Sequence, residues 1–179
     1  MCNRNQGQGA SSGYNWLPLN IMNQNHAILL IEDNEDDVFF MRRALKAAGI
    51  ENPLSVARDG QEAIDYLKGN HPFADRTKFQ IPCLAFLDLK LPHLSGHEVL
   101  EWLRSQEHLR ELVVLVLTTS RERRDIDEAY RKGANAYLVK PSSPPELLQM
   151  MMSVKNFWLK YNNYPSNGVD VACSAADIQ

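Results

Sequence analysis

Long apolar stretches are missing from this chain: none of its 179 residues lies in a segment long and apolar enough to span a bilayer. The start of the chain holds one apolar patch, residues 16–19, which is too short and broken for a signal peptide. Cysteine is also scarce. Cys2, Cys83 and Cys173 lie far apart without a C-x-x-C pair, so neither a zinc site nor a disulfide framework is indicated. We therefore expect a cytoplasmic protein in a reducing compartment.

An excess of charge of one sign is lacking as well. The formal net charge is −3, and no basic face is evident for nucleic acid or for a membrane surface. The chain also has no G-x-G-x-x-G pattern and no G-K-[ST] loop, the glycine-rich patterns that bind nucleotide phosphates. We expect no nucleic-acid partner, no membrane partner and no nucleotide site of these kinds.

The composition, with 44% hydrophobic and 23% charged residues, suits one domain with a full core. We place this domain at residues 26–162. Residues 1–25 are rich in Asn, Gln, Gly and Ser and are predicted to be a disordered arm. Residues 163–179 are predicted to be a disordered tail, and we expect no output domain after the core.

Strand and helix patterns alternate along the domain. Short apolar runs predict five strands, at residues 28–31, 54–57, 83–87, 112–117 and 136–139. Apolar residues at helical spacing predict five helices, which include residues 36–48, 60–67, 99–103, 126–130 and a long last helix at 146–161. Strict alternation predicts an α/β fold with a doubly wound parallel sheet, (βα)5, in the flavodoxin-like strand order 2-1-3-4-5.

Charged side chains follow three of the predicted strands. Glu32 and Asp33 follow the first strand, Asp88 the third and Lys140 the fifth. Because open α/β sheets bind ligands at the carboxyl ends of their strands, we expect three carboxylates and one ammonium to meet there. Mg²⁺ prefers oxygen ligands such as carboxylates, water and phosphate oxygens. The pattern predicts a site for Mg²⁺ and a phosphoryl group, with Asp88 as the nucleophile.

Two more side chains complete this prediction. Lys140 can bring a cation to a phosphate oxygen, and Thr118, at the end of the fourth strand, can bring a hydroxyl. Each residue alone also has a structural explanation: acidic residues favour helix N-termini, and we assign Asp36 and Asp37 to that role. Their joint occurrence at strand ends favours the site.

The residues above resemble the receiver domain of two-component response regulators over residues 27–161. The resemblance lies in the acidic pair Glu32-Asp33, residues 58–63, residues 88–96, Thr118, and Tyr137 three before Lys140-Pro141. The long loop before the third strand and residues 157–159 are similar to a single-domain subgroup. That subgroup includes the regulators paired with cyanobacterial phytochromes.

The resemblance implies that Asp88 accepts a phosphoryl group, with Mg²⁺, from a phosphohistidine on a sensor histidine kinase. It also implies that Thr118 and Tyr137 move to report this event, and that Lys90 offers its backbone carbonyl to the metal. Thr119 departs from the family, which usually has a very small residue there. We expect the β-branched side chain of Thr119 to crowd the site and to affect the rate of phosphorylation.

Two other functions remain open. An aspartyl-phosphate phosphohydrolase would need a second Asp two residues after the nucleophile, where Lys90 stands, and Lys90 cannot act as the acid at neutral pH. A pseudo-receiver that binds partners without phosphorylation should lack Asp33, Asp88 or Lys140, and all three are present. We therefore expect a signalling phosphoacceptor, with no enzymatic chemistry beyond its own phosphorylation and dephosphorylation.

The last helix adds a prediction about partners. It carries Phe157, Trp158 and Tyr161, more aromatic surface than one-sided packing needs. We expect this helix, the fourth helix and the fifth strand to form one face. Phosphorylation by a phytochrome-like sensor kinase would then control docking or homodimer formation through this face. The alternative is that Phe157 and Trp158 close the core.

Overall fold

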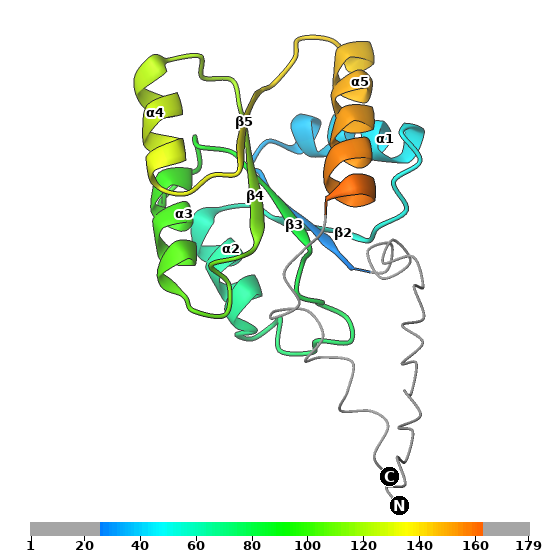
Figure 1. The fold of residues 1–179 in the computed structure, drawn as a ribbon. Coiled ribbons are helices and arrows are strands. Elements are labelled where there is room, and N and C mark those ends of the chain that lie inside the picture. Colours follow the sequence, from blue (N-terminus) through cyan, green and yellow to red (C-terminus); the bar gives the residue numbers. More distant parts are fainter. Residues whose placement is uncertain (1–25, 163–179) are drawn as a thin grey trace, which may run out of the picture.

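The computed structural model describes residues 26–162, so the predicted arm (1–25) and tail (163–179) lie outside the described residues and stay predictions. The described chain forms one sheet of five parallel strands in the order β2-β1-β3-β4-β5 (Figure 1). The strands are β1 Ile28–Ile31, β2 Leu54–Ala57, β3 Leu84–Leu87, β4 Val113–Thr118 and β5 Ala136–Val139. The predicted α/β fold and the predicted strand order are confirmed.

The helices cover both faces of this sheet. They are α1 Glu35–Ala47, α2 Gly60–Lys68, α3 Gly96–Ser105, α4 Arg123–Arg131, α5 Pro144–Val154 and the π-helix η2 Lys155–Tyr161. In Figure 1, α1 and α5 lie on one side of the sheet and α2, α3 and α4 on the other. Two apolar clusters fill the spaces between these layers.

Alternation along the strands divides the core between the two clusters. In β1, Ile28 and Leu30 pack on the α1 side, whereas Leu29 and Ile31 pack on the α2 side. Every residue of β1, β3 and β4 is buried, as expected of central parallel strands covered on both faces. These three strands hold the carboxyl-end edge of the sheet rigid.

Local signals set the ends of α1. The Asn34 side chain caps its N-terminus by accepting from the amides of Asp36 and Asp37 at 2.9 and 3.1 Å. Gly49 follows its C-terminus with φ +67°, a left-handed conformation that favours glycine. The predicted end of this helix at residue 48 agrees with the structure, in which Ala48 is the C-cap.

The last helix is continuous through the predicted residues 146–161, but its form changes within them: α5 ends at Val154 and the π-helix η2 follows directly. Apolar spacing does not distinguish i→i+5 from i→i+4 hydrogen bonding over two turns. Tyr130 was expected on the core side of α4, but it is 52% exposed, and Ala129 is the buried residue there.

No helix within residues 26–162 has the length and apolar character needed to cross a membrane.

Candidate functional site

The candidate residues stand one step beyond the ends of their strands. The amides of Glu32, Asp88 and Lys140 each continue the sheet ladder by donating to the neighbouring strand. Their acceptors are the carbonyls of Ala57 at 2.9 Å, Ile31 at 3.0 Å and Thr118 at 2.8 Å. These bonds place Glu32 and Asp88 on neighbouring strands at the carboxyl-end edge, with Lys140 on β5 beyond Thr118 of β4, as the predicted strand order implies.

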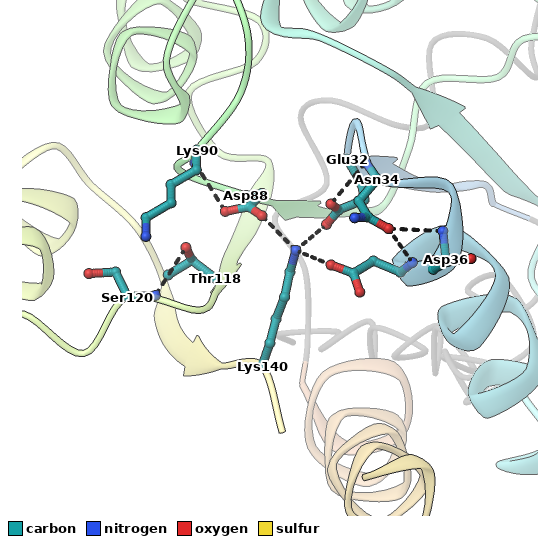
Figure 2. Close-up of polar contacts among 9 residues, drawn as sticks. Glu32, Asn34, Asp36, Asp88, Lys90, Thr118, Ser120 and Lys140 are labelled. Atoms are coloured by element: carbon teal, nitrogen blue, oxygen red, sulfur yellow. Dashed lines mark hydrogen bonds and ion pairs between the residues drawn. The ribbon is translucent and has the colours of Figure 1, made fainter. Parts of the chain in front are cut away.

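The ammonium of Lys140 is the centre of the site. Its Nζ lies 2.5 Å from Asp88 Oδ2, 2.6 Å from Glu32 Oε2 and 2.8 Å from Asp37 Oδ2. Figure 2 shows the Lys140 ammonium between the carboxylates of Asp88 and Glu32. Glu32 and Asp88 are buried, with 2% and 6% of their surface exposed. The site therefore holds one cation, with 11% of its side chain exposed, among three carboxylates.

The loop after β3 fixes the other side of Asp88. Its Oδ1 accepts from the Lys90 amide at 3.1 Å (Figure 2). Gly96, the first residue of α3, packs against the Asp88 backbone, where a Cβ would lie 2.2 Å from the Asp88 carbonyl oxygen. A capping box between Ser95 and Glu98 holds the start of α3. Gly96 is thus required by close approach, and it holds the Asp88 loop in place.

Burial and charge shift the pKa values at this site. Burial raises the pKa of Glu32 to about 7, and the charges of Asp88 and Asp37 add to this, against the hydrogen bond from Lys140. Burial alone would lower the pKa of Lys140, but its hydrogen bonds to Asp37, Asp88 and Glu32 outweigh burial and raise it. Lys140 therefore stays charged at all physiological pH values.

Asp37 is the residue of this cluster that the sequence interpretation missed. Its assignment to the helix N-terminus alone is wrong, since its carboxylate pairs with Lys140. The assignment of Asp36, which is exposed in the first turn of α1, agrees with the structure. Because α1 begins only a few residues after β1, its first turn lies beside the strand ends. This short distance in sequence was the signal that could have placed Asp37 at the site.

A second polar cluster joins Thr118 to α4. The Ser120 amide donates to Thr118 Oγ1 at 3.5 Å (Figure 2), and its hydroxyl donates to Asp125 Oδ2. The Tyr137 hydroxyl donates to the Ser120 carbonyl at 3.2 Å. Burial raises the pKa of Tyr137, so its hydroxyl keeps its proton. Ser120, which the sequence interpretation did not single out, connects both predicted switch residues to the start of α4.

The remaining predicted residues lie around these clusters. Asp33 is exposed and stands outside the Lys140 contacts. Thr118 is fully buried as the last residue of β4, while the neighbouring Thr119 is exposed. Lys90 is exposed, with its backbone at the Asp88 carboxylate.

Comparison with known proteins gives the family. The family model described as the response regulator receiver domain matches residues 28–152. The chain belongs to the response regulator receiver family. Members of this family are signalling proteins that receive phosphoryl groups from sensor histidine kinases in phosphorelays, and this protein is a response regulator of that kind. The hydrolase and pseudo-receiver alternatives are not favoured.

Single relatives agree along most of their length. The probable methanogenesis regulatory protein FilR2 of Methanothrix harundinacea is 38% identical, over 77% of this chain and 86% of the relative. The response regulator Rcp1 of Synechocystis sp. is 32% identical, over 78% of this chain and 92% of the relative. The structure of the phosphorylated cyanobacterial phytochrome response regulator RcpA is 33% identical. It has a TM-score of 0.73 and covers 79% of this chain and 99% of RcpA.

Receiver domains bind Mg²⁺ or Mn²⁺ at the phosphorylation site, and a Mn²⁺-bound form of Rcp1 matches this response regulator with a TM-score of 0.71. That match is 32% identical and covers 79% of this chain and 99% of Rcp1. Within residues 26–162, no three His, Cys, Asp or Glu side chains are arranged to hold a metal ion. Lys140 lies among the carboxylates of Glu32 and Asp88. The donors are nonetheless all oxygen, which fits a hard divalent cation.

Proposed function

We propose that Asp88 of this response regulator is the phosphoacceptor, and that it takes its phosphoryl group from a phosphohistidine of a sensor kinase. The contacts of its carboxylate carry this proposal. Asp88 directly follows the central strand β3 and is 6% exposed. One of its oxygens is held by the Lys90 amide and the other by Lys140. A nucleophile fixed this way is oriented before the donor arrives.

The transfer needs few parts from the protein. An Asp88 carboxylate oxygen forms the bond to phosphorus while the bond from phosphorus to the imidazole nitrogen breaks, and imidazole leaves. The Lys140 ammonium would pair with one phosphoryl oxygen, and the Thr118 hydroxyl would donate a hydrogen bond to another. The charge that develops on these oxygens is thereby stabilised without reorganisation of the sheet.

Glu32, Asp33, Asp88 and the Lys90 backbone carbonyl are the proposed ligands of Mg²⁺, with Asp33 the stronger candidate for direct ligation. Three observations support this set: Glu32 and Asp88 adjoin each other across β1 and β3, both have oxygen donors, and Asp33 is exposed without an ion pair to Lys140. A bound Mg²⁺ supplies positive charge to the phosphoryl oxygens. Crowded carboxylates favour a cation, since they otherwise repel one another.

The switch would run from Thr118 through Ser120 to α4 and β5. If the Thr118 hydroxyl moved to hydrogen-bond the phosphoryl group, its contact with the Ser120 amide would change. The Tyr137 hydroxyl, which donates to the Ser120 carbonyl, would then be displaced as well. The surface of α4, β5 and the last helix would then change its partner binding.

The proposed partner is a phytochrome-like sensor kinase in the cytoplasm, because RcpA is described as a cyanobacterial phytochrome response regulator. The proposed output is a homodimer through the face of α4, β5 and the last helix. Phe157 and Tyr161 support it, with 57% and 68% of their surface exposed. Trp158 is half-buried and packs on the core cluster, which matches the alternative for that one residue.

Intact-protein mass spectrometry after incubation with Mg²⁺ and acetyl phosphate tests the proposal. The parent should gain one phosphoryl group, whereas Asp88→Asn should gain none and Asp33→Ala should gain almost none. An adduct of undiminished yield on Asp88→Asn would overturn the assignment of Asp88. An undiminished yield on Asp33→Ala would overturn the assignment of the metal ligands.

A further inference from the structure

Asp37 is one of three acidic residues in the first turn of α1, so the start of the helix does not depend on it. The N-terminus of α1 is already capped by Asn34, and Glu35 and Asp36 already place negative charge in its first turn. Among the described residues, the Asp37 carboxylate has Lys140 as its one ion-pair partner, at 2.8 Å. The two residues are 103 positions apart in sequence, and their contact joins α1 to the end of β5. Helix stability therefore does not account for this carboxylate.

The three partners of Lys140 differ in what else they serve. Glu32 and Asp88 are proposed ligands of the divalent cation, and Asp88 is the proposed nucleophile. A carboxylate oxygen that lies 2.5 or 2.6 Å from the Lys140 ammonium is already partly neutralised, so it attracts a divalent cation less strongly. Glu32 and Asp88 must therefore loosen their contacts with Lys140 before they can ligate the cation. Asp37 has no such second role.

A cavity beside the cluster separates Asp37 from the proposed nucleophile. A hollow of about 220 Å³ lies between α1, the end of β4 and the start of α5. Asp37, Glu32 and Lys140 line this hollow, but Asp88 does not. The Asp37 carboxylate therefore contacts the ammonium from the side of the hollow, whereas Asp88 contacts it from outside the hollow.

We propose that Asp37 is a positioning residue that keeps Lys140 at the site when Glu32 and Asp88 release it to serve as cation ligands. This inference rests on the proposed metal ligands and extends them to a residue of α1. With Asp37, the release of two partners leaves the Lys140 ammonium, which is largely shielded from solvent, still paired. Without Asp37, release would leave it unpaired, so Lys140 would compete harder for Glu32 and Asp88.

Calorimetric titration of the full chain with Mg²⁺ alone tests the proposal. Asp37→Asn should bind Mg²⁺ about three- to tenfold more weakly, as expected for the loss of one partly exposed charged contact. Asp37→Glu should restore most of the affinity. The matched control is Asp36→Asn, which removes the same charge from the same helix turn but from a residue that does not contact Lys140. It should change the affinity by less than about twofold.

Asp37→Asn and Asp36→Asn are then compared in a Lys140→Met background. This comparison separates a role of Asp37 in positioning Lys140 from a general effect of its negative charge on Mg²⁺ binding. There, Asp37→Asn should have no larger effect than Asp36→Asn. Equal effects of the two substitutions in the parent would overturn the proposal, as would an undiminished effect of Asp37→Asn in Lys140→Met. The titration needs no phosphoryl transfer, so its outcome is independent of whether Asp88 is the acceptor, which the Asp88→Asn mass measurement decides.

Discussion

Among single residues, Glu32 has the environment with the clearest measurable consequence. Its carboxylate is buried against Lys140, Asp37 and Asp88, and burial raises its pKa to about 7 from 4.5. The folded protein therefore holds this proton up to about pH 7, whereas the unfolded chain releases it near pH 4.5. The stability that Glu32 contributes is full below the unfolded pKa and is lost as pH rises through this window.

This gives a prediction for the metal-free protein. Between about pH 5 and about pH 8 the parent should lose up to about 3 kcal/mol more unfolding free energy than Glu32→Gln, which has no proton to release. Urea unfolding of both proteins in a chelator measures the difference, and titrating groups distant from Glu32 cancel in the comparison. Parallel pH profiles of parent and variant would show that Glu32 titrates normally.

At the scale of elements, the junction between α1 and η2 is open to test. The Lys155 ammonium donates to the carbonyls of Ala48 and Gly49, at 3.0 and 2.7 Å, just after the C-terminus of α1. A cation at a helix C-terminus is favourable, and the two bonds tie the π-helix to α1.

Lys155→Met should lower the free energy of unfolding by about 1 kcal/mol, because two carbonyl contacts are lost. Lys160→Met is the matched control, since Lys160 lies in the same helix and its ammonium is over the ring of its neighbour Tyr161. Chemical denaturation compares the three proteins. A loss in Lys160→Met as large as that in Lys155→Met would mean that only the net charge of η2 matters.

Elements and strand ends were predictable, because each rests on a local pattern. The apolar runs of β1 and β4 and the stop at Gly49 are readable from neighbours in sequence. The strand order then brings Glu32, Asp88 and Lys140 together without further information. For Asp37 the sequence offered only its position in the first turn after β1. Its contact with Lys140, like the contact of Ser120 with Asp125, depends on side-chain direction between elements. The π-helical turn of η2 leaves no pattern that differs from an α-helix.

For the whole molecule, the question is what the phosphorylated surface binds. Within the described residues, the large exposed apolar side chains are Phe39 and Phe40 on α1, Tyr130 on α4, Met152 on α5, and Phe157 and Tyr161 on η2. Those on α4, α5 and η2 belong to the elements of the proposed face, whereas Phe39 and Phe40 on α1 do not. Exposed aromatic residues near such a face favour an interface, and a symmetric dimer is the commonest form.

Light scattering at several concentrations tests self-association. With Mg²⁺ and beryllofluoride as a phosphoryl mimic, the parent should shift from monomer to dimer, and the double change Phe157→Ser with Tyr161→Ser should abolish the shift. Phe39→Ser removes a comparably exposed aromatic from α1 and should leave the shift intact. A parent that stays monomeric in both states would exclude the homodimer and leave docking to another protein.

The central claim, that Asp88 alone accepts the phosphoryl group, is tested most directly by locating the modification. Borohydride reduces an aspartyl phosphate to homoserine, which marks the residue permanently. Peptide mass spectrometry after Mg²⁺ and acetyl phosphate treatment should find homoserine at position 88 and at no other aspartate. Homoserine at Asp33 or Asp37, or an unmodified position 88 in a phosphorylated protein, would contradict the account.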